Sequence, residues 1–204
     1  MTGALTPERI LDAAEEVLRR FGPAKTTVVD VARTLEVSHG AVYRHFASKA
    51  ALREAVAERW LLRLREPLRP VVTEDAPAVS RIRRWLWQLF TSERALAGQD
   101  PELFATYHRA VVRSDKVQSE HLEILAGMLV EIIADGVRRG ELDVACPAET
   151  AWAVLSATDR FHNPVHVAEW DDPGIERRFE ALWTLLRWGL DKPDRDRVGV
   201  GDGS

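Results

Sequence analysis

The sequence predicts an all-α protein. Three observations lead to this prediction: apolar residues recur at helical spacing in nearly every segment, hydroxyl residues stand before these segments as caps, and glycine or proline stands at the breaks. The chain has 204 residues, of which 46% are hydrophobic and 29% are charged. This composition provides enough apolar residues for a folded core and does not indicate disorder.

The N-terminal part, residues 1–66, predicts four helices. The expected helices are residues 7–21, 27–35, 38–46 and 49–65. Each follows a hydroxyl side chain that can cap it, and the caps are Thr6, either Thr26 or Thr27, Ser38 and Ser48. Pro7 suits the first position of a helix, and Gly22 suits a helix end. We therefore expect three short helices and a fourth, longer one.

Residues 31–46 have the pattern of a helix, a tight turn and a second helix. At this point the chain resembles the TetR family of transcriptional regulators. The residues that match are Thr27, Ala32, Val37, Ser38, Gly40, Tyr43, His45, Phe46, Lys49 and Leu52. The sequence departs at Glu36, where the family commonly has glycine, and a left-handed residue other than glycine costs about 1 kcal/mol. The resemblance implies a helix-turn-helix DNA-binding domain over residues 1–66, with a turn that is less tight than usual.

Charge is distributed in a way that agrees with such a domain. The whole chain has a net charge of -4, but residues 25–65 carry eight Lys or Arg and four acids, and so have a local charge of +4. A helix that enters the major groove needs a small residue where its backbone approaches DNA, and Gly40 and Ala41 meet this need.

The resemblance also implies particular DNA contacts. The residues expected to contact phosphates are Tyr43, His45, Lys49, Thr27 and Thr26. The residues expected to meet base edges are His39, Ala41 and Arg44. Ser38, which caps the reading helix, completes the predicted DNA-binding set together with Gly40. Arg44 has a second interpretation, in which it is solvated or holds a phosphate.

Residues 67–77 contain three prolines and mark the boundary to a second domain, residues 67–191. Its expected helices are residues 78–96, 101–113, 114–142, 147–163 and 174–190. The last two carry wide apolar faces, which in TetR-like proteins pair with a second copy; packing within one chain is the alternative. Residues 192–204 are polar and rich in glycine, and we expect this tail to be disordered.

The resemblance implies that a small-molecule effector binds inside the second domain. The candidate lining residues are Trp85, Phe90, Phe104, Tyr107, His108, Met128, Trp152, Phe161 and His162. Each aromatic residue at helical spacing has a simpler interpretation as plain core. The sequence does not indicate the chemistry of the effector.

Asp159, His162 and His166 have spacings of three and four, which could place three metal ligands on one helical face. However, the Asn163-Pro164 pair disfavours a helix that continues through His166, so we predict no metal site and no cofactor. The sequence has no glycine-rich phosphate loop, no serine nucleophile elbow and no HExxH motif, and an enzyme is disfavoured.

These observations predict a TetR-like homodimeric repressor that binds a palindromic operator in double-stranded DNA and is released by an unidentified small molecule. The alternative is a helical protein-protein adaptor that does not bind DNA. The single cysteine, the absence of a signal peptide pattern and the absence of an apolar run of membrane-spanning length predict a cytoplasmic protein without a membrane partner.

Overall fold

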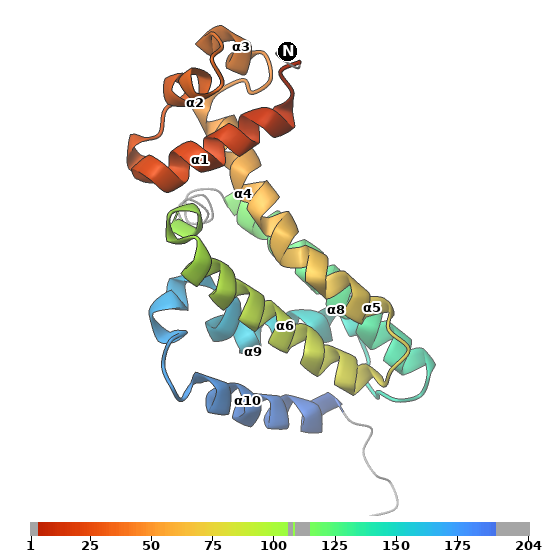
Figure 1. Cartoon of the computed structure of the whole chain (residues 1–204). Coiled ribbons are helices and arrows are strands. Elements are labelled where there is room, and N and C mark those ends of the chain that lie inside the picture. The colour runs from red at the N-terminus through yellow and green to blue at the C-terminus, as the bar shows by residue number, and fades with distance from the viewer. Residues whose placement is uncertain (1–3, 106–107, 109–114, 191–204) are drawn as a thin grey trace, which may run out of the picture. The chain divides into compact units, whose positions relative to one another are not determined.

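The structure is a computed structural model that describes residues 4–105, 108 and 115–190. Its regular elements are helices, which confirms the predicted all-α class (Figure 1). In chain order they are α1 (Pro7–Lys25), α2 (Val28–Thr34), α3 (His39–Tyr43), α4 (Lys49–Arg65), the 3-10 helix η1 (Glu66–Leu68), α5 (Arg69–Thr73), α6 (Ala78–Gln99), α8 (Asp115–Arg138), α9 (Pro147–His162), the 3-10 helix η2 (Pro164–Glu169) and α10 (Ile175–Leu190). Residues 101–105 are also helical.

The described residues form two compact units. The first unit comprises residues 4–67 together with the described residues of 91–123. The second unit comprises residues 68–90 and 124–190. Helices α6 and α8 each contribute residues to both units. The predicted sets of site residues can therefore be examined unit by unit.

In the first unit, α1 packs against α2 and α4, and α2 packs against α3. The buried side chains that hold these helices together include Ile10, Val17, Leu18, Val31, Val42, Val56 and Trp60. Four caps have the expected form, because Thr6, Thr27, Ser38 and Ser48 each accept a backbone N–H from the first turn of the following helix. The amphipathic pattern and the caps therefore specify this unit jointly.

Three predicted helix limits need correction. Gly22 has a left-handed backbone (φ 72°), but one further helical turn follows it before Thr26 ends α1. Helix α3 ends at Tyr43 rather than at Phe46. Residues 67–77 were expected to interrupt the helical pattern, but η1 and α5 continue it to Thr73, because Pro70 lies within the first turn of α5, where its missing N–H is not needed.

In the second unit, the start of α6 lies close against the end of α8. A Cβ atom added to Gly136 would lie 2.5 Å from the Cβ of Ala78 and 2.8 Å from Cδ1 of Leu142, so only glycine permits this approach. Arg81 forms an ion pair with Asp135 across the same helix pair. Apolar packing and a buried ion pair thus fix α6 on α8 here.

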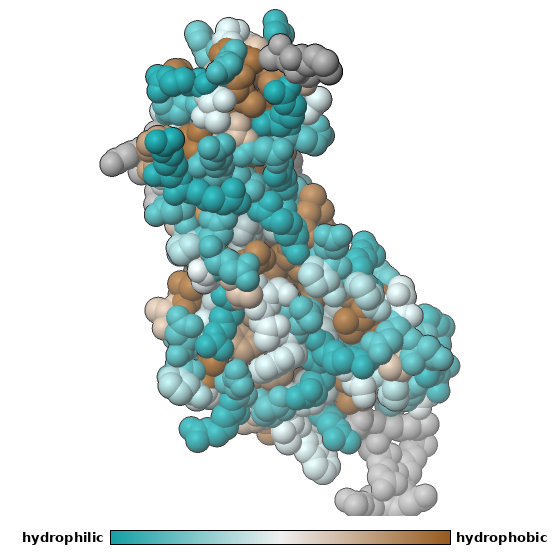
Figure 2. Space-filling view, in the orientation of Figure 1, coloured by the Kyte–Doolittle hydropathy of each residue, from teal (hydrophilic) through white to brown (hydrophobic). Residues whose placement is uncertain are grey.

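No described helix has both the length and the apolar composition that crossing a membrane requires. Figure 2 shows hydrophilic residues over most of the visible face, with hydrophobic residues exposed in smaller patches. The exposed large hydrophobic side chains of α9 and α10 are Trp152, Leu185 and Trp188, with exposed fractions of 41%, 71% and 74%. These three residues form no part of the core of their own unit.

Candidate nucleic-acid interface

The turn between α2 and α3 is closed by backbone hydrogen bonds. The N–H of Glu36 donates to the carbonyl oxygen of Arg33 (3.1 Å), and the N–H of Val37 donates to that of Ala32 (3.0 Å). Glu36 has φ 55° and is the one described residue other than glycine with a positive φ. Glu36 therefore adopts the left-handed conformation that favours glycine, and this conformation costs free energy in a residue that has a Cβ atom.

Helix α3 has a buried side and an exposed side. Ser38 caps it through a hydrogen bond from the N–H of Ala41 (3.2 Å). Ala41 and Val42 are buried, with exposed fractions of 7% and 0%, and pack towards the domain core. The interpretation of Ala41 as a base contact is thus corrected, because its methyl group faces inward.

Gly40 lies on the exposed side of α3. A Cβ atom added there would meet only Oγ of Ser38, at the ordinary contact distance of 3.9 Å, and its φ is not positive. Neither packing nor backbone conformation within the chain requires a glycine at this position. The space above Gly40 is open to an external group.

The exposed side chains of this region, residues 38–49, are rich in nitrogen donors. His39, Arg44 and His45 are exposed and Lys49 is half-buried. The side chains of Arg44, His45 and Lys49 form no hydrogen bond and no ion pair with the residues that the structure describes. His39 packs edge-on against Tyr43, with ring centroids 6.4 Å apart, and Tyr43 is 44% exposed. These groups are available to an anionic partner such as a phosphate.

The two threonines before α2 differ from each other. Thr26 is 6% exposed, and its hydroxyl donates to the carbonyl oxygen of Gly22 (2.9 Å), so it ends α1 and its hydroxyl does not face a phosphate. Thr27 is exposed and forms a capping box with Asp30, to whose Oδ2 its hydroxyl donates (2.5 Å). This hydrogen bond lowers the pKa of Asp30. Of the two, only Thr27 remains a candidate for a phosphate contact.

A buried acid connects α1 to α4 beneath this region. Glu15, whose side chain is 3% exposed, forms an ion pair with Nε of Arg59 (2.9 Å) and accepts a hydrogen bond from Nη1 of Arg63 (2.9 Å). Arg19 adds a third contact at 3.1 Å and also pairs with Asp100 at 2.6 Å. A buried carboxylate with three guanidinium partners is well satisfied, and it fixes the two long helices that carry α2 and α3.

The residues predicted to line an effector site do not all belong to the same unit. Phe104 and His108 belong to the first unit, with their rings stacked at 6.4 Å, whereas Tyr107 lies outside the described residues. The others belong to the second unit, where Trp152 is exposed and the remaining five, Trp85, Phe90, Met128, Phe161 and His162, are buried.

Phe90 and Phe161 also pack together within an aromatic cluster of the second unit. Their ring centroids lie 5.6 Å apart, and Phe161 meets Phe179 at 5.3 Å. Trp87 completes the cluster, 5.1 Å from Phe179. Such contacts are ordinary for a hydrophobic core, so both interpretations of these aromatic residues stand.

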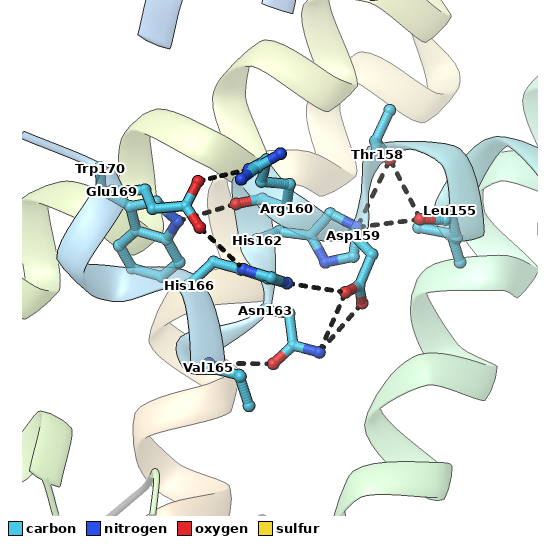
Figure 3. A network of polar contacts seen from close by, with 10 residues as sticks. All are labelled: Leu155, Thr158, Asp159, Arg160, His162, Asn163, Val165, His166, Glu169 and Trp170. Carbon is cyan, nitrogen blue, oxygen red and sulfur yellow. Dashed lines mark hydrogen bonds and ion pairs between the residues drawn. The ribbon is translucent and has the colours of Figure 1, made fainter. Parts of the chain in front are cut away.

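The three residues considered as metal ligands lie at the end of α9 and in η2 (Figure 3). Nε2 of His162 lies 3.3 Å from the carbonyl oxygen of Leu155 and 3.4 Å from the hydroxyl of Thr158, inside the core. His166 instead lies between Asp159 (3.6 Å) and Glu169 (3.3 Å). The two imidazoles thus have different partners, and the described residues contain no group suited to a metal ion.

The same network ends α9 and starts η2. Asn163 donates to Oδ1 of Asp159 (3.0 Å) and accepts from the N–H of Val165 (3.1 Å). Glu169 pairs with Arg160, which lowers the pKa of Glu169, and the buried indole of Trp170 donates to the carbonyl oxygen of Arg160 (3.1 Å). These contacts support a structural role for this cluster.

Sequence reasoning missed Glu93, which is completely buried on α6. A signal was available: Leu86, Leu89 and Phe90 form the buried stripe of this helix, and Glu93 continues it at a spacing of three to four residues. A carboxyl on an otherwise apolar stripe is unusual, because burial of a charge is costly unless it is paired.

Comparisons with known proteins agree with this geometry. Residues 10–56 match the family model described as "Bacterial regulatory proteins, tetR family", and residues 78–183 match "Tetracyclin repressor-like, C-terminal domain". The HTH-type transcriptional regulator TtgR of Pseudomonas putida is 29% identical over 160 residues, which cover 74% of this chain and 75% of the relative.

Two solved structures share the fold. SmeT, the repressor of the Stenotrophomonas maltophilia multidrug efflux pump SmeDEF, has a TM-score of 0.66 at 22% identity and covers 95% of this chain and 93% of its own. FadR from Bacillus subtilis, in complex with stearoyl-CoA, has a TM-score of 0.67 at 20% identity and covers 90% of this chain and 99% of its own. At these identities the two structures support the fold alone.

Proposed function

Since the chain belongs to the TetR family of bacterial transcriptional regulators, we propose that it is a homodimeric repressor that binds a palindromic operator in double-stranded DNA. The family consists of regulators rather than enzymes. In this proposal, residues 1–66 read the operator in the cytoplasm, and residues 67–191 bind a small-molecule effector and a second copy of the chain. Effector binding lowers the affinity for DNA because the effector prefers the arrangement that does not fit the operator.

The observation that carries the proposal is the exposed side of residues 38–49. The side chains of three potential cations there, Arg44, His45 and Lys49, form no hydrogen bond or ion pair with the described residues, and the exposed backbone at Gly40 has open space above it. A major-groove reader needs both features, since phosphates require cations and base edges require close approach of the helix. We assign Tyr43, His45, Lys49 and Thr27 to phosphates, and His39 and Arg44 to base edges.

Dimer formation is supported by the exposed apolar side chains of α9 and α10. Trp152, Leu185 and Trp188 are the exposed large residues of these two helices. Scattered apolar residues are normal on a protein surface, but two tryptophans and a leucine on adjoining elements favour a contact with a second copy. We expect Leu185→Glu to shift the sedimentation coefficient from that of a dimer towards that of a monomer, and an unchanged coefficient would exclude this interface.

The proposal that this chain binds an effector is supported by ligand complexes of proteins with the same fold. One solved structure is a SmeT-triclosan complex, with a TM-score of 0.64, and FadR was solved with stearoyl-CoA. These ligands differ in size and charge, so they support the presence of a site and not the chemistry of its ligand.

The test is selection of the purified full chain on random DNA duplexes at two salt concentrations. We expect a palindromic sequence to be enriched and the affinity for it to fall steeply with salt, because phosphate contacts release counterions. Absence of enrichment together with salt-insensitive behaviour would favour the adaptor alternative.

A matched pair of glycine variants sharpens this test. Gly40→Ala places a methyl group on the exposed side of α3, where we expect it to weaken operator binding without loss of folding. Gly98→Ala also adds a methyl group in open space on an exposed helix face, but in α6. If both variants bound the operator like the parent chain, α3 would not approach DNA through Gly40.

A further inference from the structure

Glu93 occupies a position at which α6 otherwise buries apolar side chains. Its exposed fraction is 0%, equal to that of Leu89 one turn earlier. Both carboxyl oxygens are buried, and neither has a hydrogen-bond partner among the residues that the structure describes. Unpartnered buried carboxyls are rare in folded proteins, because the desolvation of the group is not compensated.

The other deeply buried glutamate of the same unit shows how such a group is ordinarily stabilised. Glu15 is 3% exposed and contacts Arg19, Arg59 and Arg63. Among the described residues, Glu93 has no such neighbour. Burial raises its pKa well above the ordinary value, because it disfavours the charged form of the carboxyl. The carboxyl therefore retains an unused capacity to bind a cation.

Aromatic side chains are available in the unit that contains Glu93. Trp60 and Phe104 pack edge to face with ring centroids 5.9 Å apart, and the ring of His108 stacks on Phe104 at 6.4 Å. Trp60 and Phe104 are both buried. Aromatic faces attract organic cations, and this attraction is strongest where water is excluded.

We propose that Glu93 is the recognition carboxylate of the effector site and that it selects a hydrophobic organic cation. This inference rests on the proposed function in one respect, namely that the helical body binds an effector. The cation supplies the charge that the described residues do not place beside Glu93, and the apolar body of the cation packs against apolar side chains. A neutral hydrogen-bond donor would satisfy the carboxyl without ionising it.

The binding step has a defined proton balance. Glu93 is protonated in the free chain, and in the complex its carboxylate pairs with the cation, so the carboxyl proton passes to the buffer. One proton is released for each cation bound, and no other bond is formed or broken. A purely apolar binding site releases no proton, which separates the two possibilities.

The experiment is titration calorimetry of the full chain at pH 7 in two buffers of different ionisation enthalpy. The probes are 1-methylquinolinium and its uncharged isostere 1-methylnaphthalene. We expect the cation to bind with release of about one proton and the isostere to bind without proton release. Glu93→Gln is expected to weaken binding of the cation by about tenfold or more and to abolish the proton release, while it leaves binding of the isostere unchanged.

A second variant keeps the test independent of folding defects. Glu93→Leu replaces the unpartnered carboxyl with an apolar side chain of similar size, and we expect it to raise Tm by about 2–4 °C or more and to lose the cation. No binding of the cation probe by the parent chain, proton release that persists in Glu93→Gln, or a lower Tm of Glu93→Leu would each overturn the proposal. The titration contains no DNA, so its result is separate from failure of operator selection.

Discussion

Residues 38–49 and residues 158–170 have similar side chains in opposite situations. Each region contains two histidines, an arginine and a large aromatic residue. In residues 158–170 the histidines, Arg160 and Trp170 all have protein partners (Figure 3). In residues 38–49, the side chains of Arg44 and His45 are exposed and form no hydrogen bond or ion pair with any described residue.

This difference shows that the type of residue does not decide its role. A buried polar group needs a partner within the protein, and its removal leaves another group unsatisfied. An exposed polar group is satisfied by water, so the fold can leave it free for a ligand at little cost. The end of α9 therefore stabilises the fold, whereas residues 38–49 form a candidate binding surface.

The largest expected contrast between the two regions is in stability. Trp170 is 1% exposed and its indole N–H is hydrogen-bonded, so we expect Trp170→Ala to lower the free energy of unfolding by about 3–5 kcal/mol. Tyr43→Ala removes an aromatic ring that is 44% exposed, and we expect a change below about 1 kcal/mol. Urea denaturation of both variants measures the contrast. Equal losses would mean that Tyr43 belongs to the core.

The second contrast is in DNA affinity. Lys49→Ala removes a cation whose side chain forms no hydrogen bond or ion pair with the described residues, and we expect it to weaken operator binding by about tenfold and to lower the salt slope by about 1. Arg177→Ala is the matched control, because it removes an exposed cation from α10 in the other unit. Fluorescence anisotropy at several salt concentrations measures both. A salt slope that stays the same in Lys49→Ala would remove Lys49 from the phosphate contacts.

The sequence predicted the elements of the fold because their determinants are local. Periodic apolar residues and the caps Thr6, Ser38 and Ser48 act within a few residues of the helix that they specify. The direction of a side chain on a short helix depends instead on packing. For this reason the inward position of Ala41 and the buried hydroxyl of Thr26 were not apparent from the residues.

Contacts between residues that are distant in sequence could not be predicted from local patterns either. The pairing of Glu15 with Arg59 and Arg63 spans more than forty residues of chain, and spacing gives no indication of it. The spacing of Asp159, His162 and His166 suggested a shared site, but the structure gives the two imidazoles different partners. Glu93 could have been found, since it interrupts an apolar stripe.

The third contrast concerns pH. Burial lowers the pKa of His162 below its ordinary value of 6.5. Below pH 6.5 the folded chain therefore binds fewer protons than the unfolded chain, so the free energy of unfolding falls as pH decreases, by at most about 1.4 kcal/mol per pH unit. We expect His162→Gln to make urea denaturation between pH 7 and 5.5 less dependent on pH. An identical pH dependence in the variant would show that His162 does not contribute.

The smallest expected effect lies at the turn between α2 and α3. Glu36 adopts a left-handed backbone (φ 55°), which glycine adopts without strain, so we expect Glu36→Gly to raise the free energy of unfolding by about 0.5–1 kcal/mol. Glu36→Ala is the matched control, because it removes the carboxylate but keeps the Cβ atom and therefore the strain. If both variants were equally stabilised, the cost at this position would come from the charge of Glu36 and not from its backbone. If only Glu36→Gly were stabilised, the turn would carry backbone strain without a compensating contact, and the fold would tolerate it because the exposed residues that follow it contribute little to stability.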